Sequence, residues 1–514
     1  MCNIFSRIFK AGDTGLTVCR VAKVLGIGAA LLLIAGCGSS SHPSPTANDP
    51  FASDPAATVP LTQLSSDTFT NASSQHATEV EPGSYSFGTT IITSFQVARI
   101  SGGGAADIGY AISNDSGATW QNGLLPGLTS FEAAGTNSAV SDTSVIYDVK
   151  HGVWLISSLP ISATRIQVAV SRSSDGGASW DNPVIVAQGA DLDKDWITCD
   201  NTSTSAHYGN CYMEWDDNGN SNQIYMSTSS DGGLTWSAGA AVTGARGLGG
   251  QPLAQPGGAV IVPFLADAGV IQSFSSTDGG GTWGNLVQVA NVSDHAVAGG
   301  LRSDALPSAQ EDAAGNIYVI WQDCRFRASC ASNDLVMSTS ANGTNWTQSA
   351  RIPIDAVSST VDHFIPGLGI DPATAGSTAH LALTYYYYPQ SNCVAATCAL
   401  YAGFISSADG GSTWSAATPI AGPMALSWLP STDSGQMVGD YIASSFSGGN
   451  AYGFFAVAKA KSGPTFNEAI YTTQMGFNVA AAEGKNSSAG DRPIESASIH
   501  AALRKNVTPK AIRR

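Results

Sequence analysis

Charged side chains are scarce in this sequence: Asp, Glu, Lys and Arg together make up 12% of its 514 residues. Acidic residues outnumber basic ones by 39 to 23, so the formal net charge is −16. Because the chain has no surplus of positive charge, we do not expect nucleic acid as a partner. It does not exclude an acidic sugar, because a local cluster of arginines can override the mean charge. Glycine is abundant instead, with 56 residues, which indicates turn-rich β structure and not helices.

The sequence also lacks the common motifs of nucleotide and metal chemistry. It contains no P-loop, no dinucleotide-binding fingerprint and no His-Glu-x-x-His. We therefore expect no cofactor and no metal.

No two cysteines have the Cys-x-x-Cys spacing that a zinc site would favour. Three of the nine lie in the N-terminal region, and the other six fall in close local pairs. An even number of locally paired cysteines indicates disulfides formed in an oxidising compartment. The expected disulfides are Cys199–Cys211, Cys324–Cys330 and Cys393–Cys398.

The apolar run Val24–Ile34 near the N-terminus is too short to cross a bilayer comfortably as a helix. Basic residues precede this run, and Ile34–Cys37 resembles a bacterial lipobox. The resemblance implies that residues 1–36 are a signal peptide and that Cys37 carries a lipid. We expect a lipoprotein held to a membrane of the bacterial cell envelope through Cys37, outside the cytoplasm (outer membrane or cell surface). A plain transmembrane anchor is the alternative.

Two segments are predicted to lie outside the folded domain. Residues 37–56 are rich in Ser, Pro and Ala and predict a flexible, disordered tether. Residues 481–514 lose the alternation typical of strands and end in basic residues, which predicts a mobile, disordered tail. Residues 57–480 remain for one domain, which we expect to be a monomer.

One short pattern, Ser-x-Asp-x-Gly-x-x-Trp, recurs along this domain, and we call it the box. Its copies lie about 50 to 70 residues apart, so one structural unit is repeated. A sixth copy, Thr339/Ala341/Gly343/Trp346, keeps the glycine and the tryptophan but not the aspartate. The five intact copies are Ser113/Asp115/Gly117/Trp120, Ser173/Asp175/Gly177/Trp180, Ser229/Asp231/Gly233/Trp236, Ser276/Asp278/Gly280/Trp283 and Ser407/Asp409/Gly411/Trp414.

Each residue of the box has a reason to form a turn. The aspartate accepts hydrogen bonds from the backbone N–H groups that follow it, and the glycine supplies a positive φ. The tryptophan then covers the hairpin with a large ring. Strand-like alternation such as Gln223–Ser227 precedes each copy, so the box joins two antiparallel strands.

The repeated box resembles the Asp-box of the sialidase (BNR-repeat) superfamily, which implies an all-β propeller. Six units carry a box, and one more without a box can be drawn over residues 437–473. Seven blades are therefore favoured, with six as the alternative. A seventh blade needs an outer strand, either from residues 475–480 or from residues 57–66. In the family the boxes lie on the face opposite the ligand pocket.

The loops of that opposite face are unusually polar for so weakly charged a chain. These loops enter the first strand and leave the second strand of each unit, so they meet around the mouth of the central channel. Polar groups that converge at a channel mouth indicate a ligand site. Capping of strand ends by single charges is the alternative. The charged and aromatic members include Glu79, Glu81, Arg99, Asp142, Asp193, Lys194, Asp195, Trp196, Glu214, Arg302, Asp304, Asp323, Arg325, His363, Tyr386, Asp440 and Tyr441.

The family resemblance assigns roles to some of these residues. Arg99, Arg302 and Arg325 would hold a sialic-acid carboxylate, as planar guanidinium groups can. Tyr441 or Tyr386 would be the nucleophile and Glu214 or Glu79 its base. The remaining predicted residues are Asp195 in the catalytic set and Asp304, Trp196, Asp323 and His363 in substrate binding.

The sequence departs from the family at one motif. Sialidases carry an Arg-Ile-Pro triplet on the strand before the first box, whereas here Phe95–Arg99 has no proline. The triplet Arg351-Ile352-Pro353 lies instead where an outer strand is expected. We expect a glycan-active protein, either a sialidase-like or a related glycoside hydrolase. The alternatives are a propeller that binds a glycan or a protein without catalysis, and a purely structural envelope protein.

Overall fold

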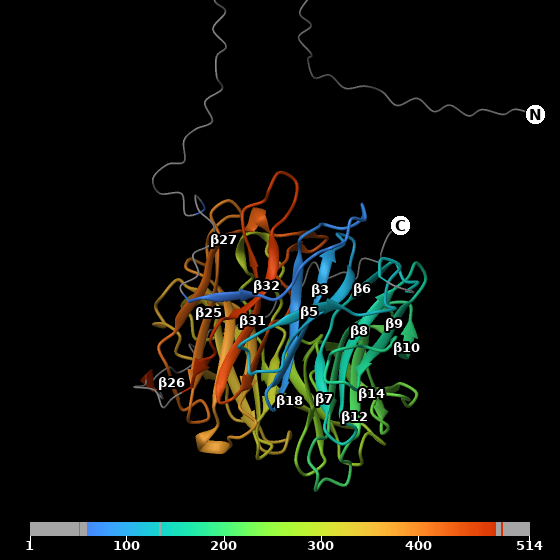
Figure 1. Cartoon of the computed structure of the whole chain (residues 1–514). Coiled ribbons are helices and arrows are strands. Elements are labelled where there is room, and N and C mark those ends of the chain that lie inside the picture. The colour runs from blue at the N-terminus through green and yellow to red at the C-terminus, as the bar shows by residue number, and fades with distance from the viewer. Residues whose placement is uncertain (1–50, 52–58, 133–134, 480–484, 487–514) are drawn as a thin grey trace, which may run out of the picture. The chain divides into compact units, whose positions relative to one another are not determined.

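The computed structural model describes residues 51, 59–132, 135–479 and 485–486, and strands make up nearly all of its regular structure (Figure 1). These residues belong to one compact unit. The predicted signal peptide, Cys37, the linker apart from Phe51, and most of the tail lie outside the described residues. Within the described part, no helix has the length and apolarity to span a membrane.

The strands form antiparallel groups in which neighbours along the chain pair with one another. Group 1 contains β2 (Glu79–Phe87), β3 (Thr90–Arg99), β4 (Ala105–Ser113) and β5 (Gln121–Leu124). Group 2 contains β7 (Val145–Asp148), β8 (Val153–Ile161), β9 (Ile166–Ser173) and β10 (Val184–Gly189). Group 3 contains β11 (Leu192–Cys199), β12 (Cys211–Asp217), β13 (Gln223–Ser229) and β14 (Ala240–Leu248).

Three further groups repeat this order. Group 4 contains β15 (Leu253–Ala254), β16 (Val260–Ala266), β17 (Val270–Ser276) and β18 (Gly284–Asn291). Group 5 contains β19 (Ser308–Glu311), β20 (Ile317–Asp323), β21 (Asp334–Ser340) and β22 (Ala350–Arg351). Group 6 contains β23 (Asp362–Ile370), β24 (Leu381–Tyr388), β25 (Ala399–Ser407) and β27 (Thr418–Ala425).

Group 7 joins the two ends of the domain. It contains β30 (Ala443–Ser447), β31 (Asn450–Ala458), β32 (Glu468–Thr473) and, from the other end of the chain, β1 (Leu61–Gln63). Its outer strand β1 comes from residues 57–66, one of the two candidate segments named from the sequence. The remaining short elements are β6 (Ala139–Ser141), β26 (Thr413–Trp414), β28 (Ser431–Thr432), β29 (Gly435–Gln436), β33 (Phe477–Asn478), β34 (Lys485–Asn486), η1 (Asn218–Asn220), η2 (Ala298–Gly300), η3 (Ala328–Cys330), η4 (Gly376–Thr378) and η5 (Leu426–Trp428).

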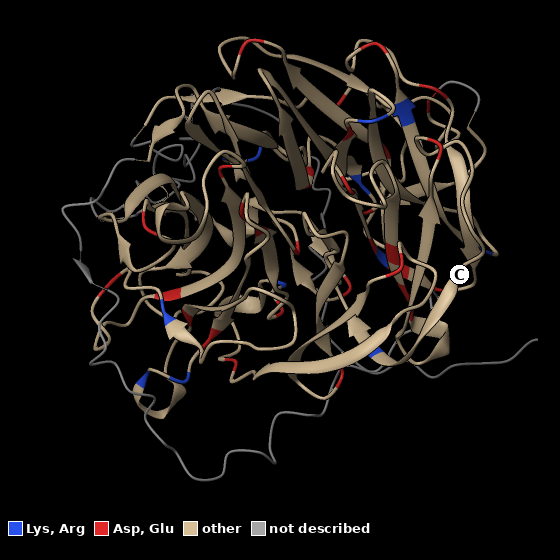
Figure 2. Ribbon diagram, turned by 90° about the horizontal axis from the view of Figure 1, so that it is seen from below, with Lys and Arg blue, Asp and Glu red and all other residues tan. Residues whose placement is uncertain are grey.

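The first strands of neighbouring groups contact one another in a closed order, β2, β7, β11, β15, β19, β23, β30 and back to β2. Figure 2 shows the sheets of the described part set around a centre. Every residue of β20 and β23 is buried, whereas the outer strands β10 and β18 include exposed positions. This burial is expected when sheets pack face to face around an axis. The prediction of an all-β propeller is confirmed, and the closed order of first strands supports a count of seven blades.

The box forms a compact turn, as the copy at residues 229–236 shows. The Ser229 hydroxyl donates to Oδ1 of Asp231 at 2.9 Å and accepts the Gly233 N–H at 3.0 Å. The Asp231 carboxylate also accepts the N–H of Thr235 at 2.9 Å and its hydroxyl at 2.5 Å. The Trp236 indole N–H donates to the Gly233 carbonyl at 3.3 Å. Burial alone would raise the pKa of Asp231, but these hydrogen bonds lower it.

The sixth box differs from the sequence prediction. Its serine is Ser340 and not Thr339, and Asn342 takes the place of the aspartate. Oδ1 of Asn342 accepts backbone N–H groups at 2.9 and 3.0 Å, as the carboxylate does elsewhere. The alignment on Gly343 and Trp346 missed this substitution because the turn is one residue shorter between the serine and the glycine.

In each box, the glycine three residues before the tryptophan faces the preceding group of strands. A Cβ atom added to Gly177 would lie 2.6 Å from Cδ1 of Ile112 in group 1. A Cβ atom on Gly233 would lie 3.0 Å from Cδ2 of Leu155 in group 2. The other box glycines do the same, each toward the group before it: Gly280 toward Tyr212, Gly343 toward Ile261, Gly411 toward Met337 and, closing the ring, Gly117 toward Tyr452.

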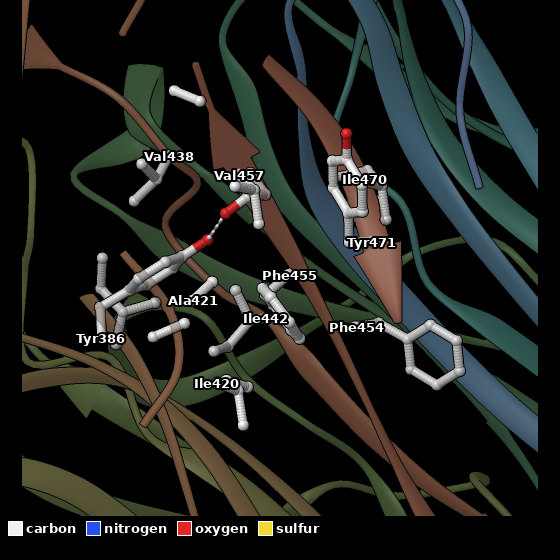
Figure 3. Close-up of a cluster of buried hydrophobic side chains, with 14 of the residues drawn as sticks. Tyr386, Ile420, Ala421, Val438, Ile442, Phe454, Phe455, Val457, Ile470 and Tyr471 are labelled. Carbon is white, nitrogen blue, oxygen red and sulfur yellow. Dashed lines mark hydrogen bonds between the residues drawn. The ribbon is translucent and has the colours of Figure 1, made fainter. Parts of the chain in front are cut away.

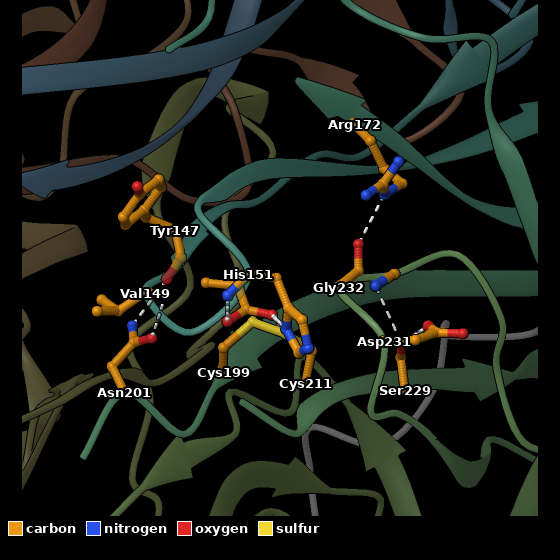
Figure 4. Close-up of a disulfide and its surroundings, with 12 residues drawn as sticks. Tyr147, Val149, His151, Arg172, Cys199, Asn201, Cys211, Ser229, Asp231 and Gly232 are labelled. Atoms are coloured by element: carbon orange, nitrogen blue, oxygen red, sulfur yellow. Dashed lines mark hydrogen bonds and ion pairs between the residues drawn. A yellow bond between two sulfur atoms is a disulfide. The ribbon is translucent and has the colours of Figure 1, made fainter. Parts of the chain in front are cut away.

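The three predicted disulfides are confirmed, and Cys199–Cys211 joins directly paired residues of β11 and β12 (Figure 4). Figure 4 also shows the neighbouring box, in which Nε of Arg172 in group 2 donates to the Gly232 carbonyl of group 3 at 2.6 Å. The box therefore also contacts the preceding group through a hydrogen bond.

The largest apolar cluster lies among groups 1, 6 and 7 (Figure 3). Tyr386, predicted as a substrate-binding residue and as an alternative nucleophile, is fully buried in it. Its hydroxyl donates to the Ala456 carbonyl at 2.8 Å. The prediction for Tyr386 is corrected: because its strand β24 is a second strand within the packed sheets, the side chain belongs to the core.

We expect Gly177→Ala to destabilise the protein by about 2–5 kcal/mol, because φ is +90° and the new methyl meets Ile112 and Ile92. Gly176→Ala provides a matched control, since φ is +78° there but no atom lies within 4 Å of the added Cβ. It should cost only about 1 kcal/mol. Urea unfolding of both variants measures the difference. Equal losses would show that the contact between groups adds nothing.

Candidate functional site

Charged residues at one end of the ring occupy strained backbone positions in the first strands or, for Asp142, in the loop just before one. Glu81, Asp142 and Lys194 have φ values of 57°, 43° and 51°, in the left-handed region that side chains rarely adopt. The pairing of β2 and of β11 with its neighbour shifts register at these points. Such bulges re-aim side chains and often occur at functional sites. Here they direct charges from neighbouring groups toward one another.

Lys194 is the centre of this charged cluster. Its Nζ lies 2.6 Å from Asp440, 3.3 Å from Asp142 and 4.0 Å from Glu81. These acids belong to groups 7, 2 and 1, so a single lysine from group 3 contacts three other parts of the ring. All four side chains are 7% exposed or less. A buried cation of this kind depends on its carboxylates, because a lone buried charge is costly.

Arg302 completes the cluster by pairing with the same Asp440 carboxylate. The backbone N–H of Asp440 donates to Glu81 at 3.1 Å. Burial acts to raise the pKa of Asp440, but the charges of Arg302 and Lys194 outweigh it and hold this pKa well below its ordinary value. Asp440 therefore stays ionised at any physiological pH.

A small cavity of about 20 Å³ lies beside the cluster. Its charged lining is Lys194, Asp195 and Asp440, and its aromatic lining is Trp196 and Tyr441. These residues come from the start of groups 3 and 7, while groups 4, 5 and 6 contribute Gln251, Pro307 and Pro366. A volume of this size holds about one water molecule, so a larger ligand would need the lining side chains to move apart. The polar end of the ring therefore contains a small cavity lined by residues from several groups.

Several carboxyl groups beside the cavity are buried without a cation. Burial first, and then the charge of Asp142, raises the pKa of Asp195 well above its ordinary value. Ser157 is the side-chain donor near Asp195, although neither carboxyl oxygen makes a hydrogen bond of good geometry. Burial likewise raises the pKa of Glu214 and Asp216. Burial therefore favours the protonated form of these three groups, whereas the cations beside Asp440 favour its ionised form.

Glu214 lies behind Asp195, away from the cavity lining. A Cβ atom on Gly250 would lie 2.6 Å from its carboxyl carbon, so the side chain is pressed against group 4. The nearby charges that act on Tyr441 come instead from Asp142, Glu81 and Asp195. Glu214 is therefore not placed as the base of a tyrosine nucleophile.

Tyr441 and Trp196 form the aromatic wall of the cavity, with ring centroids 5.3 Å apart in an edge-on arrangement. The Tyr441 oxygen accepts the backbone N–H of Thr143 at 2.8 Å. Burial raises the pKa of Tyr441 well above its ordinary value. Among the described residues no carboxylate is hydrogen-bonded to its hydroxyl. Tyr441 is at the site as predicted, but it lacks the partner that would activate it as a nucleophile.

Arg99 and Glu79 lie deeper, where group 1 meets group 7. Arg99 is buried and donates to Gln96 at 2.5 Å. Glu79 accepts the Ser65 hydroxyl at 2.8 Å and lies near the buried Glu468. Burial raises the pKa of Glu79 to about 8. Neither Arg99 nor Glu79 lines the cavity, so their predicted roles in binding and catalysis find no support in the geometry.

Arg325 and Asp323 pair with each other and not with the cluster. Nη2 of Arg325 lies 2.6 Å from Asp323, and Arg325 also donates to the Asn291 carbonyl. The three predicted arginines therefore do not all converge: Arg302 touches the cluster, the charges of Arg302 and Glu81 act on the buried Arg99, and Arg325 is held elsewhere. Sequence order could not show this, because the loop after β20 folds back on its own group.

His363 and Asp304 are two further predicted site residues that the structure places outside the cavity lining. His363 is buried between the rings of Tyr385 and Tyr387, and burial lowers its pKa to about 4. It does not line the cavity. Asp304 is close enough to Asp440 and Arg302 to feel their charges, and burial raises its pKa. Asp304 therefore belongs to the margin of the site.

The residues that the prediction left without a role are Lys194, Asp440, Glu81 and Asp142. All four were visible in the sequence as polar residues where first strands begin. No sequence signal showed that their side chains meet, since they come from four different groups.

Two sets of side chains have ligand atoms spaced for a metal ion within the described residues. In one, Asp148/Cys199/Cys211, the sulfurs are joined in a disulfide. In the other, Asp334/Asp355/His363, both carboxylates pair with Arg327. Neither set lies at the cavity.

No protein-family model matches the sequence, and no curated protein matches it. Among solved structures, the Hadza microbial sialidase Hz136 is 15% identical, with 78% of this chain and 66% of that chain covered at a TM-score of 0.40. The NanB sialidase from Streptococcus pneumoniae is 15% identical, with 80% and 70% covered at 0.39. A polysaccharide lyase PL25 ulvan lyase is 10% identical, with 83% and 98% covered at 0.47. This chain thus spans about two thirds of the first sialidase.

We expect Lys194→Met to destabilise the protein by about 3–5 kcal/mol at neutral pH, because Asp440 and Asp142 lose their shared cation. The loss should shrink as the pH falls and the carboxylates take up protons. Lys150→Met is the control, since Lys150 is exposed and donates only to the Tyr208 carbonyl. Urea unfolding at neutral and acidic pH measures both. A cost as small as that of the control would remove Lys194 as the centre of the cluster.

Glu79 should make stability depend on pH. Its pKa in the folded state is raised to about 8 from 4.5, so it stabilises the fold below pH 4.5, and this contribution is lost as the pH rises toward 8. Glu79→Gln should therefore be more stable than the parent at pH 8 and show a smaller decline from acidic to basic pH. Glu132→Gln, at a half-buried position, is the control. Parallel unfolding curves for Glu79→Gln and the parent would contradict the expectation.

Proposed function

We propose that this protein is a glycan-active enzyme that cleaves a glycosidic bond in the cavity beside Lys194. One observation supports this most directly: the cavity is lined by two carboxyl groups in opposite surroundings, with burial raising the pKa of Asp195 and two cations lowering the pKa of Asp440. Glycoside cleavage commonly uses two carboxyl groups in these two states. The different surroundings of the two carboxyl groups indicate which one donates a proton and which one stays charged.

Asp195 is the general acid in this proposal. It would donate its proton to the oxygen of the leaving group as the glycosidic bond breaks. Asp440 supplies a fixed negative charge that stabilises the positive charge developing on the sugar ring. A water molecule then forms the new bond to the anomeric carbon and returns a proton to Asp195. Trp196 and Tyr441 offer aromatic faces against which a sugar ring can pack.

The finer expectation of an exo-sialidase has less support from this geometry. The clamp of Arg99, Arg302 and Arg325 is not assembled, and Tyr441 has no base. We retain the broader class, a glycoside hydrolase of propeller fold.

We also propose that the protein acts as a monomer outside the cytoplasm, anchored through a lipid on Cys37. The three disulfides support export, because such bonds persist in oxidising compartments.

A glycan-binding or protein-binding propeller without catalysis is the second candidate. The hydrogen bond from Thr143 to the Tyr441 oxygen favours it, because it holds that oxygen in a structural contact. This candidate keeps the cavity as a ligand site and gives Asp195 no catalytic role.

The test is hydrolysis of a panel of 4-methylumbelliferyl glycosides, the α-sialoside included, by the detergent-solubilised chain. We expect turnover of at least one substrate, and about a hundred-fold or greater loss in Asp195→Asn. Turnover should also fall as the pH rises and Asp195 loses its proton. The control is Asp181→Asn, which removes the same charge from an exposed residue. Glycan binding without turnover would establish the second candidate instead.

A further inference from the structure

The two cations that contact Asp440 at the cavity are already paired with carboxylates of the protein itself. Lys194 contacts Asp440, Asp142 and Glu81, and Arg302 contacts Asp440. Asp440 therefore holds both cations, and it lies in the cavity lining with Lys194. A carboxylate on a ligand would need one of these cations for itself.

An acidic sugar would meet an unfavourable charge balance in this cavity. It would have to displace Asp440 from Lys194 or Arg302, which would leave Asp440 buried without its partners. It would also lie beside Asp195, whose own ionisation is already disfavoured by burial and by Asp142. Anion recognition needs free donors such as an unpaired guanidinium. Among the described residues that line the cavity, none is an arginine.

An uncharged sugar finds suitable partners in the same place. Asp195 lines the cavity, and its buried carboxyl oxygens make no hydrogen bond of good geometry in the protein, so they can accept sugar hydroxyl groups once the lining moves apart. Oε1 of Gln251 accepts the Ala309 N–H at 2.7 Å, and no hydrogen bond from its amide nitrogen is found in the described part. That nitrogen can donate to a sugar oxygen. The ring face can pack on Trp196.

We propose that the cavity takes an uncharged sugar, and that Asp440 excludes acidic sugars by holding Lys194 and Arg302. The proposal rests on the proposed function, since it names the substrate class of the same cavity. Asp440 then determines specificity, because it pairs with the two cations that an acidic sugar would need.

The experiment measures binding of matched glycan pairs to the full chain in detergent. Each pair differs by one acidic residue, as in lactose and 3′-sialyllactose, or the β-glucoside and β-glucuronide of 4-methylumbelliferone. We expect the uncharged member of at least one pair to bind about ten-fold more tightly or better. Tighter binding of the acidic member in every pair that binds would overturn the proposal.

Asp440→Asn supplies a gain-of-binding readout that misfolding cannot imitate. Removing this charge frees Arg302 and leaves Lys194 with Asp142 and the more distant Glu81. Binding of the acidic member should then improve about ten-fold relative to the uncharged one. Glu81→Gln is the second variant if Asp440→Asn does not fold, and it should shift the ratio in the same direction. Asp181→Asn should leave the ratio unchanged.

The outcomes separate the two proposals. An unchanged ratio in both cluster variants would refute the role of Asp440 while leaving glycan cleavage standing. Turnover with a preference for the acidic glycoside would also keep the proposed function and refute the uncharged substrate. Absence of binding and of turnover with every glycan would refute both.

Discussion

The close approach of each box glycine to the preceding group is the constraint on which the ring depends. A Cβ atom on Gly177 would lie 2.6 Å from Ile112 and one on Gly233 would lie 3.0 Å from Leu155, so a methyl group would force the neighbouring side chains to shift. The hydrogen bonds of the box hold the glycine in the positive φ that this approach needs. Six of the boundaries between groups use this contact. At the remaining one Gly453 of β31 faces Thr384 of β24, again because no side chain can intervene.

Because the groups are held in a ring, their first strands bring side chains from distant parts of the sequence together. Lys194 reaches Asp440, 246 residues away, and Asp142, 52 residues away. The left-handed residues of the bulges aim these side chains at one another and away from the sheets. The resulting cluster links groups 1, 2, 3 and 7 through ion pairs.

The charges of this cluster also give the cavity its chemical character. The same burial that raises the pKa of Asp195 is overcome at Asp440 by two cations, so the pKa values of two neighbouring carboxyl groups are shifted in opposite directions. Such a difference is what acid catalysis needs. The ion pairs of Asp440 also occupy the positive charge that recognition of an acidic sugar would require, so the proposed catalysis and the proposed substrate preference depend on one set of ion pairs.

The sequence by itself determined the features that depend on local chemistry. The box turns, the three disulfides and the order of antiparallel strands each involve residues close in the chain, and their patterns predicted them. Even there, the shortened box at Asn342 was missed. Only the tertiary structure decided which polar loops meet: it assembled Lys194 with Asp440, removed Arg325 to its own pair with Asp323, and placed Tyr386 in the core. The physical reason is that these contacts depend on the rotation and packing of whole sheets, which no local pattern encodes.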